Sequence, residues 1–167
     1  ADPAGSFEPT LPENDGLLKS DWPGAACEVD DAAEHITMET GHVTVQFSRR
    51  PFAFSFHAGE QVLTASSPED SIRFGCGRCI LAMTSPEDEK FLGFGYQGAR
   101  YVYPFSPDWA PLNHRGRSIQ MTGLTSHRAY YTPFFQSSRG YGFFLNTLVQ
   151  TDWDMAKNDK RKYAITI

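Results

Sequence analysis

Residues 130–147 read YYTPFFQSSRGYGFFLNT. In this stretch, two aromatic, strand-like runs flank a short turn between Gln136 and Gly140. Aromatic side chains favour the pleated, half-buried surface of a β-sheet. The stretch therefore predicts a β-hairpin, and it directs attention to an all-β fold.

Alternating apolar and polar residues support that fold class in the first half of the chain. Val43, Val45 and Phe47 alternate with polar residues, and 52–56 repeats the pattern with three Phe. This period is typical of strands with one buried face, so we expect a hairpin whose Phe side chains face the core. Further strands are expected at 61–65, 79–84, 91–95, 117–122, 129–135, 141–149 and 162–167.

The overall pattern predicts an antiparallel β-sandwich with little helix. Short strands separated by turn signals are typical of that architecture, and no stretch shows a convincing helical period. Gly93 and Gly95 lie inside a strand-like block, where close backbone packing or a β-bulge explains them best. The stretch from Tyr101 to Gly116, with three prolines, is expected to be a long irregular loop.

A length of 167 residues suits one domain. Residues 1–35 are rich in Pro, Gly, Asp and Glu, and we expect an extended N-terminal arm with little regular structure. Residues 36–167 are expected to form the β-sandwich domain. The chain begins Ala1-Asp2-Pro3 rather than with Met, which indicates a processed chain or a start added for expression. The compartment stays open, with the secretory pathway slightly favoured.

Charge is distributed unevenly along the chain. Residues 1–92 carry 16 acids against 6 bases, whereas residues 93–167 carry 4 acids against 9 bases. Either the two halves form solvated faces of one domain, or the basic half docks against another chain or domain. The basic residues are scattered and form no basic helix, so we expect no nucleic-acid partner. No run of 18 apolar residues occurs, so we expect no membrane span.

Cys76-Gly77-Arg78-Cys79 has the spacing of a redox or zinc motif. A thioredoxin-like site needs this motif at the start of a helix, but Cys79 leads into an apolar, strand-like run. A structural zinc ion needs four ligands, and no second pair of cysteines occurs. A disulfide from Cys27 to Cys76 or Cys79, tying the arm to the sandwich, is the favoured interpretation.

The five histidines show no metal-ligand spacing, so we expect neither a metal site nor a cofactor. His57 is expected on a sheet face. His114 is expected to be a polar group at the surface of a loop. Three residues of the long loop are expected to contact a sugar or, more simply, to pack against a further domain. They are Arg100, Trp109 and Arg115.

Three blocks together resemble the N-terminal, galactose-mutarotase-like β-sandwich of glycoside hydrolase family 31, the family of α-glucosidases, α-xylosidases and transglucosylases. The stretch 130–147 resembles the family's Pro-Phe strand followed by a Tyr-Gly turn. Residues 91–97, which read FLGFGYQ, resemble its Tyr-Gly-Leu-Gly-Glu block, with Gln97 in place of Glu. The hairpin at 41–57 resembles a repeated strand pair. The resemblance covers residues 36–167 and implies a supersandwich-like fold.

The resemblance also implies a partner. Family members continue into a catalytic (β/α)₈ barrel of about 250 residues, which this chain is too short to contain. The two catalytic carboxylates lie in that barrel, so no catalytic residue is expected here. Asp152-Trp153-Asp154-Met155 echoes the nucleophile block, but it lies in the sandwich region, where we expect a strand-end Trp with solvated acids.

The family's loop before the Pro-Phe strand often reaches the sugar. By that position, Thr125, His127 and Arg128 are the candidate substrate-binding residues, although the loop here contains no carboxylate. The chain is thus expected to be a non-catalytic domain or fragment of a retaining α-glycosidase. It would pack on the barrel, lend a loop to a pocket for an oligosaccharide or α-glucoside, and be inactive alone. The alternative is a stand-alone carbohydrate-binding or protein-interaction module.

Overall fold

The structure is a computed structural model of the 167-residue chain. It describes residues 11–16, 19, 21, 23–96, 113–121, 130–147 and 149–167. Within these ranges the only helix is α1, Leu11–Asn14, and every strand pairing is antiparallel. The expected all-β fold with little helix is confirmed. No helix among the described residues is long and apolar enough to cross a membrane.

The first five strands form one sheet in which each strand pairs with the next along the chain, and we call it the meander sheet. Its strands are β1 (Glu28–Asp31), β2 (His35–Glu39), β3 (Thr44–Arg49), β4 (Phe52–Ala58) and β5 (Gln61–Ala65). Residues 28–31 were expected to belong to the extended arm, but they form β1 and pair with β2. A polar four-residue edge strand has no apolar alternation by which the sequence could reveal it.

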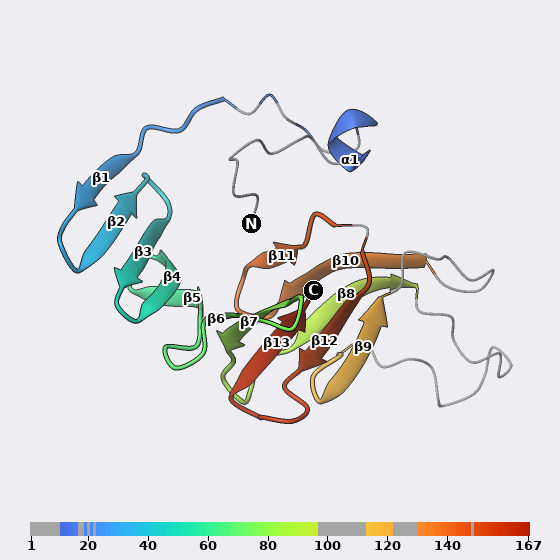
Figure 1. Cartoon of the computed structure of the whole chain (residues 1–167). Coiled ribbons are helices and arrows are strands. Elements are labelled where there is room, and N and C mark those ends of the chain that lie inside the picture. Colours follow the sequence, from blue (N-terminus) through green and yellow to red (C-terminus); the bar gives the residue numbers. More distant parts are fainter. Residues whose placement is uncertain are drawn as a thin grey trace, which may run out of the picture.

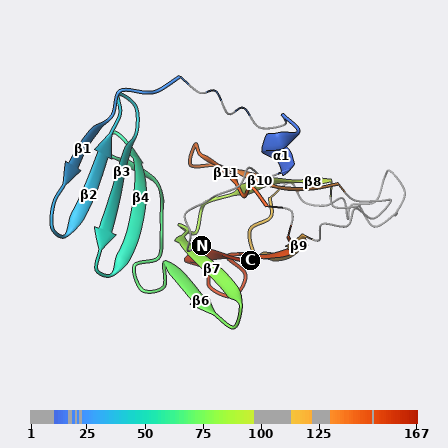
Figure 2. The same cartoon turned by 45° about the horizontal axis from the view of Figure 1, so that its top comes forward.

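The remaining strands form two sheets that pack face to face (Figure 1; Figure 2). The large sandwich sheet has the order β6 (Ile72–Gly75), β7 (Arg78–Thr84), β13 (Lys162–Thr166), β12 (Thr151–Met155) and β9 (Arg117–Met121). The small sandwich sheet has the order β11 (Gly142–Phe144), β10 (Tyr130–Ser137) and β8 (Phe91–Tyr96). The hairpin expected within residues 130–147 is the pair β10–β11.

Aromatic side chains fill the space between the two sandwich sheets. Phe91, Phe94 and Phe135 of the small sheet meet Trp153 and Tyr163 of the large sheet, with ring centroids 5.2–6.2 Å apart. All five are fully buried. Edge-to-face contacts at such distances stabilise a core beyond the area that they bury. The hydrophobic core therefore lies between β8 and β10 on one side and β12 and β13 on the other.

The Phe side chains of β4 were expected to face this core, and that prediction is wrong in part. Phe54 packs against the edge of the core cluster, but Phe52 is 49% exposed and Phe56 is half-buried. The alternation itself is present, because Phe47 pairs with Phe54 and Val45 with Phe56 on one face. Among the described residues, no second sheet covers that face as the two sandwich sheets cover each other.

The 136–140 turn joins the meander sheet to the sandwich. Arg139 donates a hydrogen bond from Nη2 to the carbonyl oxygen of Val62 (3.2 Å), and its own carbonyl accepts one from Nε2 of Gln61 (3.2 Å). A backbone bridge between Ser66 and Met83 adds a second connection. The turn between the two aromatic runs therefore connects the meander sheet to the sandwich.

Candidate functional site

The candidate sugar-contact residues Thr125, His127 and Arg128 lie outside the described residues. The strands on either side of them are described. β9 ends at Met121, which is buried, and β10 begins at Tyr130, the register partner of Tyr96 at the end of β8. The end of β9, the start of β10 and the end of β8 lie together at one end of the sandwich (Figure 1; Figure 2). Segment 97–112 begins there, and segment 122–129 joins two strand ends there, so we call it the loop end.

His114 is buried against β8, so the prediction that it lies at the surface is wrong. Only 7% of the residue is exposed. Its ring packs edge-on against Phe94 with centroids 5.2 Å apart, and its backbone N–H donates to the carbonyl of Phe91 (2.8 Å). Nδ1 has no hydrogen-bond partner among the described residues. Burial lowers the pKa of this imidazole, and the nearby positive charge of Arg117 lowers it further.

We expect the stability of the domain to fall as the pH drops below the ordinary histidine range. The folded state holds the pKa of His114 below its unfolded value of 6.5, so the unfolded chain binds the proton more readily. This contribution is fully present above the unfolded pKa and is lost as the pH falls through the folded one. Urea unfolding at about pH 7.5 and about pH 5.5 measures the loss.

Two variants isolate that contribution. His114→Gln should reduce the difference in unfolding free energy between the two pH values. His42→Gln, at an exposed position on the β2–β3 turn, should leave it as in the wild type. An equal pH dependence in the wild type and in His114→Gln would contradict the assignment to His114.

A buried carboxyl group lies near the opposite end of the sandwich, just before β8. Glu89 is 1% exposed, and both of its carboxyl oxygens accept hydrogen bonds. The hydroxyl groups of Ser85 (2.8 Å), Ser137 (2.5 Å) and Tyr141 (2.7 Å) are the donors. We call this set the Glu89 network. It connects the start of β8 to the end of β10 and to the following turn.

Two phenols extend the Glu89 network into the core. The hydroxyl of Tyr141 also lies 3.4 Å from that of Tyr163. Burial, with the neighbouring Glu89, raises the pKa of Tyr141 to about 12, and burial raises that of Tyr163 well above 10. Both phenols therefore keep their protons near neutral pH. The Glu89 carboxyl group is fully enclosed by hydroxyl donors of its own domain, an arrangement that serves structure rather than substrate chemistry.

Arg115 is used inside the domain and is not available for a sugar. Its Nη1 donates to Oγ of Ser85 (2.7 Å) and to the carbonyl of Glu89 (3.3 Å), and its Nη2 donates to the carbonyl of Lys160 (2.5 Å). Its guanidinium thus holds the β7–β8 turn to the β12–β13 turn. Arg100 and Trp109 lie outside the described residues.

The Asp-Trp-Asp-Met stretch belongs to β12, an inner strand of the large sandwich sheet between β13 and β9. Trp153 and Met155 point into the core and are at most 1% exposed, so the expected strand-end Trp is wrong. Asp152 and Asp154 alternate with them on the outer face. Asp152 accepts a hydrogen bond from Gln120 (2.8 Å), and Asp154 accepts the backbone N–H of Lys157 (2.7 Å) at the next turn.

Cys27, Cys76 and Cys79 are all free thiols, so the expected disulfide is not formed in this structure. Cys27 directly precedes β1, the edge strand of the meander sheet farthest from β5. Cys76 and Gly77 form the two-residue turn of the β6–β7 hairpin, both with positive φ (51° and 72°). The motif thus occupies a hairpin rather than a helix start. Among the described residues, no group of three or more His, Cys, Asp or Glu could hold a metal ion.

Comparison with known proteins gives matches in structure. No protein-family model and no curated protein sequence matches the chain. A family 31 dextranase from Flavobacterium johnsoniae is similar, with a TM-score of 0.70 and 18% identity over 84% of this chain. So is the cycloalternan-forming enzyme from Listeria monocytogenes, with a TM-score of 0.71 and 22% identity over 89%. A family 31 α-xylosidase from a soil metagenome gives a TM-score of 0.65 and 16% identity over 90%.

The coverage of the other chains is much smaller. This chain spans 17%, 15% and 25% of those three proteins, which are several times longer. A likeness at this level of identity concerns the fold, and the activities of the longer proteins belong to them. The resemblance that the three sequence blocks indicated is thus confirmed at the level of the fold: this chain has a β-sandwich similar to one part of glycoside hydrolase family 31 enzymes.

Proposed function

We propose that this chain is a non-catalytic β-sandwich domain of a family 31-like retaining α-glycosidase. In this proposal it packs on a catalytic (β/α)₈ barrel, and Thr125, His127 and Arg128 lie on a loop that rims the sugar pocket. The observation that carries the proposal is the pattern of coverage. Between 84% and 90% of this chain is similar to between 15% and 25% of much longer enzymes of one family.

The surroundings of two described acidic residues, Glu89 and Asp154, support a non-catalytic role for these two groups. A retaining glycosidase needs two carboxyl groups that flank the scissile bond in an accessible site. Glu89 is enclosed by three hydroxyl donors, and Asp154 accepts hydrogen bonds from the turn that follows it. These groups are committed to the fold.

The apolar face of the meander sheet supports packing against another domain. Phe52 is 49% exposed, Met38 37% and Val29 58%. Strand register places all three on the same face as Phe47 and Phe54. A contiguous apolar face of this kind is typical of a surface that is covered in the complete protein.

The pure chain is expected to hydrolyse no α-glucoside. The assay is release of nitrophenol from an aryl α-glucoside and an aryl α-xyloside, beside an active family 31 enzyme as the positive control. Turnover that disappears when any one of this chain's own Asp or Glu residues is replaced would refute the proposal.

A stand-alone carbohydrate-binding or protein-interaction module is the second candidate. The neutral polar hollow described below favours a module with its own ligand. A folded, monomeric chain with affinity for a sugar favours this candidate. Association with a barrel-bearing chain, lost when Phe52 and Met38 are replaced by Ser, favours the first. Sedimentation in the presence and absence of the partner measures the oligomeric state and the association, and titration with a sugar measures the affinity.

A further inference from the structure

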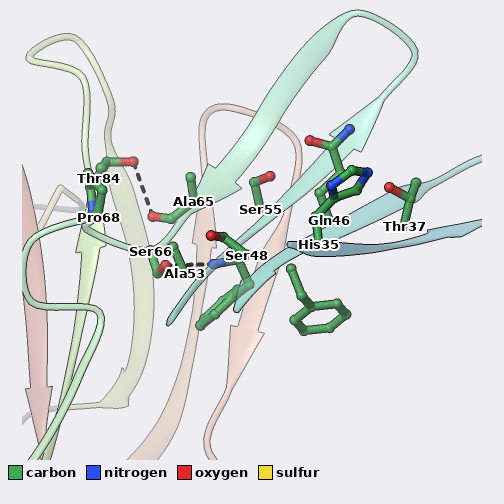
Figure 3. Close-up of a pocket in the computed structure, with 12 residues that line it drawn as sticks. His35, Thr37, Gln46, Ser48, Ala53, Ser55, Ala65, Ser66, Pro68 and Thr84 are labelled. Atoms are coloured by element: carbon green, nitrogen blue, oxygen red, sulfur yellow. Dashed lines mark hydrogen bonds between the residues drawn. The ribbon is translucent and has the colours of Figure 1, made fainter. Parts of the chain in front are cut away.

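The polar face of the meander sheet carries a trough with a volume of about 530 Å³ (Figure 3). Alternation along β2, β3 and β4 creates most of it, because the residues that alternate with the apolar ones project to this side, and Phe47 and Phe54 contribute to the lining as well. Short side chains form the floor, from Ser48 and Ala53 to Ser55. A volume of this size lies within the range of about 300–1,000 Å³ that small-molecule sites occupy.

The two banks of the trough come from different parts of the fold (Figure 3). Gln46 and His35 stand on one bank, on the meander sheet, while Pro68 and Thr84 stand on the other, beside the sandwich. Hydrogen bonds fix the second bank: Thr84 donates from Oγ1 to the carbonyl of Ala65 (3.1 Å), and Ser66 accepts the N–H of Phe54 (2.8 Å). The trough is thus part of the junction between the two bodies of the fold.

The trough offers neutral groups that both donate and accept hydrogen bonds. Among the described residues that line it, none is Asp, Glu, Lys or Arg. The side chains of Thr37, Gln46 and Ser48 make no hydrogen bond with any other described residue. A hydroxyl group and a primary amide each supply a donor and an acceptor. Ala53, Ala65 and Pro68 add apolar surface to the lining, together with Phe47 and Phe54.

We propose that this trough binds a neutral saccharide. Sugar hydroxyls are donors and acceptors at once, so they match unpartnered hydroxyl and amide side chains. The C–H faces of a sugar ring match the apolar side chains of the lining, such as Ala53, Ala65 and Pro68. An anionic ligand, such as a phosphate or an acidic peptide, finds no Lys or Arg on the lining. The site is separate from the candidate loop at 122–129, and it does not depend on whether the chain packs on a catalytic barrel.

Titration of the 167-residue chain with neutral trisaccharides of glucose and of xylose tests the proposal by NMR. The direct readout is the side-chain amide of Gln46, together with the backbone amides of residues 35–37, 46–48 and 65–68. At about 10 mM trisaccharide, a site with a Kd of about 1 mM is nearly saturated. Trigalacturonate, of similar size but anionic, is expected to bind more weakly than the best neutral sugar.

Two matched variants locate the site. Gln46→Ala should weaken binding by about fivefold, the effect of one net hydrogen bond. Gln120→Ala removes an exposed glutamine from the outer face of the large sandwich sheet, where a second hollow contains Asp152 and Asp154, and it should leave affinity unchanged. Absence of shifts with every neutral trisaccharide, shifts confined to the Gln120 hollow, or tighter binding of trigalacturonate would each overturn the proposal. None of these outcomes bears on the expected lack of hydrolysis.

Discussion

Replacing Glu89 with Ala is expected to lower the free energy of unfolding by about 3–5 kcal/mol. The substitution removes the acceptor of three hydroxyl donors, those of Ser85, Ser137 and Tyr141, in a region that water does not reach. A buried donor left without a partner costs about 1–3 kcal/mol. Since domains of this size are stable by about 5–15 kcal/mol, the variant should be close to unfolding at room temperature.

The same turn provides a matched control. Glu87 lies two residues earlier and is exposed, so Glu87→Ala should change stability by no more than about 0.5 kcal/mol. Urea unfolding followed by circular dichroism and by the fluorescence of buried Trp153 measures both variants. If Glu89→Ala is no less stable than Glu87→Ala, the carboxyl group does not hold the sandwich together.

A milder variant keeps the test informative should Glu89→Ala fail to fold. Tyr141→Phe removes one donor and keeps the ring, so we expect a loss of about 1 kcal/mol. In a Glu89→Gln, Tyr141→Phe double-mutant cycle, the two changes should not add, because both alter the hydrogen bond between residues 89 and 141. Strict additivity would show that the 2.7 Å contact contributes nothing to stability.

The strands were the most predictable part of the molecule, because alternation is a local signal. β3, β4, β5 and β7 lie where the pattern of apolar residues placed them. β12 had such a signal too: Thr151, Trp153 and Met155 are buried and alternate with two aspartates. The same residues also resemble a catalytic block, so their sequence is open to a second interpretation that competes with a strand.

The partners of buried polar groups could not be predicted, because they are distant in sequence. Glu89 is the last of three consecutive acids after Pro86, and local sequence does not distinguish it from Glu87 or Asp88. Its partners Ser137 and Tyr141 lie 48 and 52 residues away. His114 was misplaced for the same reason. It follows a Pro-rich stretch that suggests a surface, while Phe94, which covers it, belongs to another strand.

The loop end is the part of the candidate site that the sequence predicted most directly. Family position singled out Thr125, His127 and Arg128, and those residues lie outside the described ranges. The structure adds that β8, β9 and β10 converge on the point where their segment attaches. The polar trough, in contrast, had no local sequence signal, because its banks come from β2, β3 and the strand β7.

Gly93→Ala is expected to destabilise the domain by about 3–5 kcal/mol, through steric overlap added to backbone strain. Gly93 has a φ of +138°, which side chains other than hydrogen rarely allow. An added Cβ would lie 2.7 Å from the carbonyl oxygen of Phe134 and 2.9 Å from Cα of Phe135. Both atoms belong to the backbone of β10, so no rotamer change can relieve the overlap.

The sequence had indicated close backbone packing or a bulge at this position, and the register of β8 with β10 is irregular between Tyr131 and Phe135. The next residue shows what the irregularity achieves. Phe94 also has a positive φ (66°), and this conformation directs its ring into the core against Trp153 and His114. A variant that shifts Gly93 should therefore loosen the buried aromatic cluster as well as the strand pairing.

Substitutions at two other glycines distinguish the cost of backbone strain from the cost of steric overlap. Gly59, with a φ of +57° and open space around it, should lose only about 1 kcal/mol as Ala, the cost of the left-handed conformation alone. Gly75 has neither a positive φ nor a close neighbour, so Gly75→Ala should be nearly neutral. Thermal and urea unfolding of the three variants should rank them Gly93, Gly59, Gly75 in order of decreasing loss. Equal losses at Gly93 and Gly59 would mean that β8 can move away from β10, and that the close approach of these two strands is not what the core requires.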